Sequence, residues 1–201
     1  MARIRLTPEA RREQLLELGT ELLATRQLED LTIDLLAEEA RISRGLLYHY
    51  FTSKQEFQRA VIERAASELI RATAPIESPD PLVRLMGSME AYVDYVSANL
   101  TGYRSLIQAA HGGDPVIAAL YTNARGELID RMFVAAEGNA VEELGFADTP
   151  AIRLVVDGWM SMAETMVTAW AEDSRGLGRE QMLAMLLAAL PAMLTASTSS
   201  Q

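Results

Sequence analysis

The stretch "RISRGLLYHYFTSK", residues 41–54, places four ring-bearing side chains side by side, three residues ahead of the only lysine in the chain. A helix inside a protein core spreads such residues over every third or fourth position, so this cluster needs another explanation. The preceding stretch "TIDLLAEEA", residues 32–40, has apolar residues at helical spacing and can be capped by Thr32. After a three-residue turn, Ser43 can cap a second short helix. Two short helices joined in this way predict a helix-turn-helix.

The second short helix has an inward and an outward face. Leu47 and Phe51 are four residues apart and are expected, with Ile42, to point into the core. The outward face collects Arg44, Gly45, Tyr48 and His49, with Leu46 and Tyr50 beside it. The aromatic residues are therefore adjacent because they serve two surfaces, one buried and one exposed.

The outward face has the chemistry of a reader of the DNA major groove. Arg44 can donate two hydrogen bonds to a guanine, and Gly45 lets the backbone come close to the bases. Tyr48 and His49 offer polar tips and ring faces to phosphates and base edges. Lys54 stands in the first turn of the next helix, where its charge and the free N–H groups can hold a phosphate. The alternative is a short aromatic helix that only completes a core.

The charge distribution favours DNA binding only near the start of the chain. The 201 residues carry a formal net charge of −10, but residues 1–74 hold 11 Arg or Lys against 12 Asp or Glu, and the remainder holds 7 against 16. An acidic balance of this size disfavours nucleic-acid contact along the whole chain. Arg3 and Arg5 could reach a neighbouring groove as an arm, or could belong to a disordered end.

The residue types also exclude several classes of site. The chain has no cysteine and two histidines, so we expect no disulfide, no metal site and no cofactor. We find no nucleophile elbow, phosphate-binding loop, dinucleotide fingerprint or paired-histidine helix, and therefore expect no enzyme. The first residues lack a signal-peptide run, and the longest apolar run, Met182–Leu194, is too short to span a bilayer. We expect a soluble cytoplasmic protein with no membrane contact.

Signals for helix starts recur along the chain. Four times a capping side chain precedes a proline, at Thr7, Asp80, Asp114 and Thr149. No alternating strand pattern is present, so the sequence predicts an all-α fold of about nine helices. The expected ranges are 8–25, 33–40, 44–50, 54–73, 81–98, 101–109, 115–138, 150–172 and 179–196. The proline-rich stretch 73–81 is expected to separate a helix-turn-helix domain, 1–53, and a linking helix, 54–73, from a larger body, 74–201.

Residues 31–57 resemble the DNA-binding segment of the tetracycline-repressor (TetR) family of bacterial regulators, and "EQLLELGTELLA", residues 13–24, resembles its first helix. The resemblance rests on Ser43, Gly45, Leu47, Tyr48, His49, Tyr50, Phe51, Ser53 and Lys54. It implies a homodimer that reads a palindromic DNA operator, with a body that binds a small effector and forms the dimer. It also implies DNA contacts by Thr32, Ser43, Arg44, Gly45, Leu46, Tyr48, His49 and Lys54.

The chain departs from the family pattern in the turn and at the bases. Arg41 and Gln27 replace the usual glycines. A residue other than glycine at positive φ costs about 1 kcal/mol, so we expect the turn at Arg41 to be tighter or reshaped. Arg44 and Leu46 stand where proline and threonine are frequent, which leaves the operator sequence open.

The last two predicted helices are expected to form the dimer. Residues 182–194 are apolar nearly all round, so both sides of this helix need a cover, and a second subunit can supply one at Leu186 and Leu190. Helix 150–172 carries an apolar stripe and, opposite it, small and polar residues that permit close approach. The resemblance assigns the same two helices to the dimer. The alternative is a monomer with a partly exposed apolar helix.

The body is rich in aromatic and methionine side chains, which suit an apolar ligand cavity. The candidate ligand-binding residues are Tyr92, Tyr95, Tyr103, Ile107, His111, Tyr121, Met132, Trp159, Met162 and Met166. Any one of them can instead be ordinary core. Four acidic residues of these helices could favour a cationic ligand, although their positions indicate solvent exposure: Glu90, Asp94, Asp157 and Glu164. We expect a mostly apolar ligand with one or two polar groups.

These features together predict a ligand-responsive transcription regulator, a repressor that a small molecule releases from a palindromic operator. A DNA-binding regulator without an effector, either an activator or one gated by a partner protein, is the alternative. A packed body without a cavity would favour that alternative.

Overall fold

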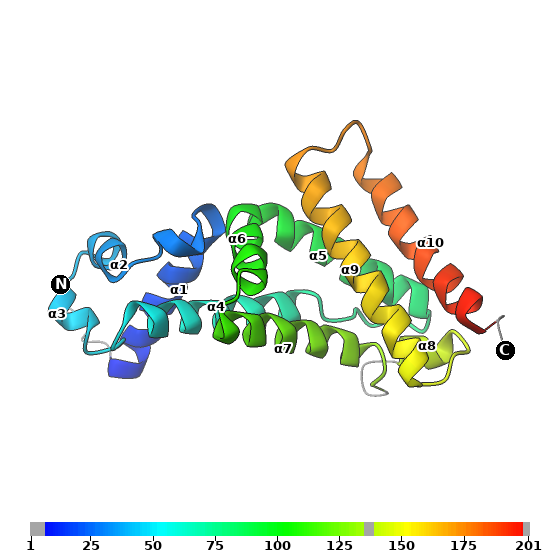
Figure 1. Cartoon of the computed structure of the whole chain (residues 1–201), viewed down its shortest axis with the longest axis horizontal. Helices are drawn as coiled ribbons and strands as arrows, with labels where there is room; N and C mark the ends of the chain where they lie inside the picture. Colours follow the sequence, from blue (N-terminus) through cyan, green and yellow to red (C-terminus); the bar gives the residue numbers. More distant parts are fainter. Residues whose placement is uncertain (1–6, 135–138, 199–201) are drawn as a thin grey trace. The chain divides into compact units, whose positions relative to one another are not determined.

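The computed structural model describes residues 7–134 and 139–198, and this part of the chain is all helical (Figure 1). Within it, ten α-helices and one short 3-10 helix follow one another. Their bounds are α1 (Pro8–Thr25), η1 (Leu28–Asp30), α2 (Ile33–Ala40), α3 (Arg44–Leu47), α4 (Lys54–Ala72), α5 (Pro81–Ala98), α6 (Leu100–His111), α7 (Pro115–Arg131), α8 (Ala140–Glu143), α9 (Pro150–Glu172) and α10 (Arg179–Thr198). The predicted all-α fold is confirmed, with one more α-helix than expected.

Most helix starts are local properties of the sequence. Each of the four predicted capping side chains, at Thr7, Asp80, Asp114 and Thr149, accepts a hydrogen bond from an N–H two or three residues further on, at 2.8–3.2 Å. The proline after each cap stands where the helix needs no N–H donor. The four predicted starts are therefore confirmed.

Two helices end several residues before their predicted limits, and a third helix was not predicted. α3 stops at Leu47 rather than at residue 50, because His49 and Tyr50 donate to carbonyl groups three residues back and the chain leaves the helix in a tighter turn. α7 ends at Arg131, and residues 135–138 of its predicted range lie outside the described residues. α8 was not expected, because a single turn is too short to show a helical period.

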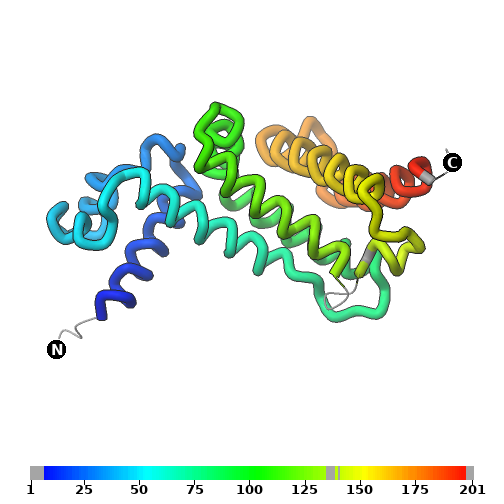
Figure 2. Tube along the Cα trace, turned by 60° about the horizontal axis from the view of Figure 1, so that its bottom comes forward, coloured from blue at the N-terminus to red at the C-terminus, as the bar shows by residue number. Residues whose placement is uncertain are grey.

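The described chain forms two compact units that do not follow sequence order. The head unit comprises the residues up to Glu68 together with Asn99–Tyr121, and the body unit comprises Leu69–Ala98 together with the residues from Thr122 onward. α4 and α7 therefore each begin in the head unit and end in the body unit, and Figure 2 shows both as unbroken helices. The functional division at residues 53 and 74 stays a prediction.

The core of the head unit is built by α1, α2, α3 and the first part of α4. Leu47 and Phe51 are fully buried, and the Phe51 ring lies 5.2 Å from the ring of Phe57. Gly19 lets α4 come close to α1, because a Cβ at this position would lie 2.6 Å from a methyl group of Val61. The inward face predicted for the second short helix is thereby confirmed.

α6 belongs to the head unit, although its residues follow the proline-rich stretch. It approaches α1 so closely that a Cβ on Gly102 would lie 1.9 Å from the carbonyl oxygen of Leu23. The buried hydroxyl of Ser105 accepts a 2.7 Å hydrogen bond from the N–H of Leu28. Small side chains at these two positions decide where α6 packs, whereas the prolines only mark where the chain turns.

The body unit is built around α9, with α5 and α10 packed against it. The predicted stripe of α9 is buried at Ile152, Val156, Trp159 and Ala163. The Trp159 indole N–H donates a 2.9 Å hydrogen bond to the carbonyl of Leu186. α9 and α10 run side by side in both views (Figures 1 and 2).

α10 has a covered face and an open face. Leu186, Leu190 and Leu194 are fully buried, whereas Met185 is 53% exposed. The expectation that Leu186 and Leu190 lie in a dimer interface is therefore wrong, because both belong to the core of the body unit. By length and composition alone, Arg179–Ser197 could cross a membrane, but one of its faces is already packed against the other helices of its unit. The open apolar face still needs a cover.

Replacing Gly102 with alanine should destabilise the protein by about 1–3 kcal/mol, the usual cost of overpacking, because the new methyl group would meet the Leu23 carbonyl. Urea denaturation measures the change. Gly126 in α7 is the control, since a Cβ there meets none of the described residues within 4 Å and Gly126→Ala should stabilise by up to about 1 kcal/mol. Equal stability of the two variants would contradict the packing of α6 on α1.

Candidate functional site

The turn between α2 and α3 has the conformation that a glycine usually provides. Arg41 has φ +53° and ψ +46°, in the left-handed region. The N–H of Arg41 donates to the carbonyl of Glu38 and that of Ile42 to the carbonyl of Ala37, each at 3.1 Å, which is the Schellman pattern of a helix end. The expectation of a tighter or reshaped turn is wrong, because these hydrogen bonds hold an arginine where a glycine is usual.

The hydroxyl groups of Thr32 and Ser43 close the N-termini of α2 and α3. Each accepts a hydrogen bond from the N–H three residues on, that of Leu35 at 3.1 Å and that of Leu46 at 3.3 Å. Both predicted caps are confirmed. Because a hydroxyl that accepts a hydrogen bond still has its own O–H, either residue can also donate to a phosphate.

The side chains predicted to face outward are exposed. Leu46 is 39% and Tyr48 is 55% exposed. Arg44, Gly45 and His49 are exposed as well. A Cβ on Gly45 would meet no atom of the described residues within 4 Å, so the packing of this part of the chain does not require a glycine there. A glycine at an open position fits the close approach of another molecule to the backbone.

An acidic residue of α2 lies against the arginine of this face. The Nε of Arg44 is 2.7 Å from a carboxylate oxygen of Asp34, and both side chains are more than half exposed. An exposed ion pair contributes only about 0–1 kcal/mol to stability. The pair nevertheless fixes the Nε edge of the Arg44 guanidinium group. The terminal nitrogens of that group are the atoms that can donate in parallel to a guanine. Asp34 is thus placed to orient Arg44.

Lys54 and its neighbours form the N-terminus of α4. The Lys54 ammonium donates to the carbonyl of Glu29 at 2.7 Å, and it has to leave or share this oxygen to hold a phosphate. The Ser53 hydroxyl accepts from the N–H of Glu56 at 3.1 Å. The Glu56 carboxylate accepts from the hydroxyl and N–H of Thr52, which lowers the pKa of Glu56. The ionised Glu56 carboxylate therefore stabilises the folded state, and this contribution is lost only as the pH falls through its lowered pKa.

The body unit contains a cavity of about 80 Å³. Its wall comes from the residues just after α4, from α5, from the end of α7 and from α9. The larger apolar lining residues are Leu85, Met89, Tyr92, Leu128, Met132, Trp159 and Met160. Two charged residues, Arg84 and Arg131, complete this part of the lining. An apolar wall with a few polar groups is typical of a small-molecule site, although such sites usually measure roughly 300–1,000 Å³.

Three of the ten predicted ligand-binding residues line this cavity: Tyr92, Met132 and Trp159. Three more are half-buried on α5 and α9 outside the lining: Tyr95, Met162 and Met166. The other four belong to the head unit: Tyr103, Ile107, His111 and Tyr121. The structure therefore brings together only a minority of the predicted set, and the ligand-binding role of these residues stays a prediction.

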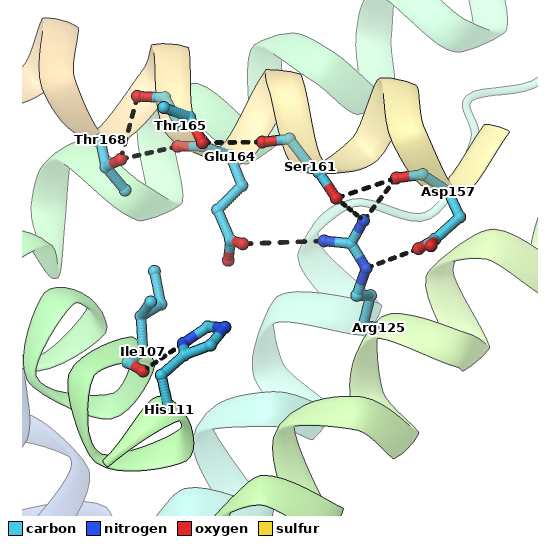
Figure 3. A network of polar contacts seen from close by, with 8 residues as sticks. All are labelled: Ile107, His111, Arg125, Asp157, Ser161, Glu164, Thr165 and Thr168. Carbon is cyan, nitrogen blue, oxygen red and sulfur yellow. Dashed lines mark hydrogen bonds and ion pairs between the residues drawn. The ribbon is translucent and has the colours of Figure 1, made fainter. Parts of the chain in front are cut away.

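Arg125 of α7 binds several residues of α9 within the body unit (Figure 3). Its Nε donates to the Asp157 carboxylate at 2.9 Å and a terminal nitrogen donates to the Ser161 hydroxyl at 2.7 Å. A Glu164 oxygen lies 3.7 Å from the guanidinium group, and the Glu164 side chain is only 15% exposed. The expected solvent exposure of Glu164 is wrong, because an arginine of the same chain faces this carboxylate.

Two family profiles match the sequence. The profile described as "Bacterial regulatory proteins, tetR family" covers residues 15–61, and the one described as "Tetracyclin repressor-like, C-terminal domain" covers residues 81–193. The chain belongs to the TetR family. It is a DNA-binding transcriptional regulator and not an enzyme. Regulators of this family bind DNA operators and act as dimers, with ligand-binding C-terminal domains.

The relatives include a transcriptional activator and a transcriptional repressor. The HTH-type transcriptional activator FasR from Mycolicibacterium smegmatis is 24% identical over 178 residues, which cover 88% of this chain and 79% of FasR. The HTH-type transcriptional repressor KstR2 from the same organism is 35% identical over 92 residues, which cover 42% of this chain and 44% of KstR2. A TetR-family regulator from Streptomyces coelicolor superposes with a TM-score of 0.83 at 27% identity, covering 98% of this chain and 85% of that chain.

Sequence reasoning missed three charged residues of these candidate sites. Asp34 reaches Arg44 only through the geometry of the turn, and no local pattern shows that contact. Arg131 stands at the last residue of α7, where a helical period ends. Arg84 had a detectable signal, because its spacing from Tyr92 places both on one face of α5. Arg3 and Arg5, the predicted arm, lie outside the described residues.

Gly45→Ala should weaken operator binding by about tenfold or more, because a methyl group would stand between the backbone and the bases. The same change should not reduce stability, since the position is open and alanine favours the helix. Fluorescence anisotropy with a selected operator at fixed salt measures affinity. Gly126→Ala is the matched control and should leave DNA affinity unchanged. Wild-type affinity of Gly45→Ala would contradict this surface as the DNA contact.

Proposed function

We propose that this TetR-family regulator is a ligand-responsive homodimer that reads a palindromic operator through α3 and the turn after it, and acts in the cytoplasm as a repressor. The observation that carries the proposal is one exposed surface above a fully buried Leu47. Its base-reading candidates are Arg44, Gly45, Leu46, Tyr48 and His49. Thr32, Ser43 and Lys54 are the candidates for phosphate contacts. The relatives include an activator and a repressor. A reporter gene behind the selected operator therefore tests whether this chain activates or represses transcription.

The dimer interface is assigned to the open faces of α9 and α10. Leu154 on α9 is 71% exposed and Met185 on α10 is 53% exposed. Gly158 and Ser161 are exposed on α9 as well, and small residues allow a second helix to approach closely. Two recognition helices must stand about 34 Å apart, or a multiple of this, to read half-sites on one face of DNA. An acidic body cannot supply that separation by attraction to DNA, so a rigid interface has to.

Leu154→Glu combined with Met185→Glu should separate the dimer and abolish tight operator binding, while each subunit stays folded because both side chains are exposed. Light scattering at micromolar concentration measures the mass, and circular dichroism checks the fold. Val116→Glu is the control, because Val116 is 52% exposed but belongs to the head unit. A wild-type monomer, or a double variant that stays dimeric, would refute the assignment.

The cavity of the body unit is the proposed effector site. Its wall includes Thr73 and Pro75, which directly follow α4, and α4 begins at Lys54. A ligand can release DNA only if it binds one conformation of the protein better than the other. α4 is the continuous element that can carry this difference from the cavity wall to the phosphate-binding end. The presence of a cavity also favours a regulator with a small-molecule effector over the alternative, a regulator that has no effector.

Filling the cavity tests the effector role. Ala163 is 2% exposed and lines the cavity, and leucine fits the small space better than tryptophan. A compound that raises the melting temperature and releases the operator should lose both effects in Ala163→Leu, while DNA affinity without the compound is unchanged. If no compound in a thermal-shift screen has both effects on the wild type, the partner-gated regulator becomes the better account.

A further inference from the structure

The cavity wall has a charge opposite to that of the chain. The chain contains 28 acidic and 18 basic residues. Among the described residues that line the cavity, Arg84 and Arg131 are the charged ones, and none is Asp or Glu. The Arg84 side chain is only 10% exposed, so water screens its charge weakly. An arginine pair at an apolar cavity favours an anionic group inside it.

The acidic residues that could have favoured a cationic ligand are placed elsewhere in the body unit. Asp94 lies 2.8 Å from Arg179, and Asp157 lies 2.9 Å from Arg125. Glu164 also faces Arg125, and none of these carboxylates lines the cavity. The electrostatic environment of the cavity therefore disfavours an ammonium group.

We propose that the cavity binds a monoanion with an apolar body, of which an aliphatic carboxylate is the simplest form. The regulatory meaning of this ligand class rests on the effector role proposed above. A guanidinium group can donate two parallel hydrogen bonds to a carboxylate, and the apolar wall takes the chain. Met89, Met132 and Met160 line the cavity and can change rotamer, which lets a space of about 80 Å³ lengthen around a flexible chain.

Arg131 connects the cavity to the last turn of α4. One of its terminal nitrogens donates to the carbonyl of Ile70 at 2.7 Å, and Ile70 lies two residues before the end of the helix. Carbonyl groups in the last turn lack intrahelical partners, so this arginine closes the helix end. A carboxylate in the cavity competes with the Ile70 carbonyl for the Arg131 guanidinium group. Binding of the anion thereby loosens the end of α4.

Arg84 has a different role from Arg131. Its terminal nitrogens bind the carboxylate of Glu143 and the carbonyl of Ser78, the latter at 2.5 Å. These two contacts fix the guanidinium group, so Arg84 supplies a stationary positive charge. Glu143 partly neutralises that charge and is not itself a lining residue. Removing the charge of Glu143 should therefore strengthen anion binding without changing the shape of the wall.

The experiment compares ligands that share an apolar chain and differ in the head group. Isothermal titration of the full-length protein with octanoate, 1-octanol and octylamine measures each affinity, and a series from butanoate to decanoate finds the best length. Octanoate should bind about tenfold or more tightly than octanol, and octylamine should bind more weakly than octanol. Arg131→Gln should reduce the preference for octanoate, since the charge of Arg84 remains, and Glu143→Gln should increase it. Arg179→Gln, which removes an arginine outside the cavity, should leave it unchanged.

Three outcomes overturn the ligand class: no carboxylate of the series binds, octanoate and octanol bind equally, or Arg131→Gln keeps the full octanoate preference. If Arg131→Gln does not fold, an unchanged preference in Glu143→Gln overturns it instead. Operator release is measured separately by anisotropy. Arg131-dependent binding of octanoate without release supports the ligand class and refutes the effector role. Release by neutral or cationic compounds that Ala163→Leu prevents supports the effector role and refutes the ligand class.

Discussion

The close packing of α6 on α1 at Gly102 is the constraint on which the arrangement of the chain depends. Any side chain at this position would collide with the Leu23 carbonyl, and the buried bond from Leu28 to Ser105 holds the same helix in register. Together they place residues 99–121 in the head unit, so the chain leaves that unit within α4, returns at α6 and leaves again within α7. α5, which lines the cavity, lies in sequence between two segments of the head. A change at the cavity therefore has more than one covalent route to α3.

In each unit of this acidic chain, individual arginine side chains make polar contacts that connect two segments. Arg44 pairs with Asp34 across the turn between α2 and α3, and Arg125 binds α9. Arg131 closes the end of α4 while it lines the cavity. Each of these side chains joins two segments, so a competing anion changes more than one contact. The same property makes DNA binding, and binding of the anionic ligand proposed above, compatible with a net charge of −10, because the positive groups are few but locally placed.

The parts of the fold that sequence could predict are those set by local chemistry. Caps at Thr32 and Ser43 and the inward Leu47 follow from spacing alone. The left-handed Arg41 could not be predicted, because two backbone hydrogen bonds, and not a glycine, produce that turn. Most of the residues that line the cavity could not be predicted, because the same aromatic and methionine side chains occur in cavity walls and in packed cores. His111 was predicted to bind the ligand, but its helix belongs to the head unit. The packing of that helix depends on Gly102, and a single glycine gives no pattern from which the packing could be predicted.

Selection of binding sites from a random pool of double-stranded DNA, with the full-length protein at fixed salt, tests the central claim most directly. The account predicts enrichment of a palindrome whose half-site centres are about 10 base pairs apart, or a multiple of this, as two recognition helices of one rigid dimer require. A guanine in each half-site is expected to be lost from the selected sequence in Arg44→Ala. Enrichment of a single half-site, or of no sequence at all, would contradict a dimeric reader that recognises DNA through α3 and the turn after it.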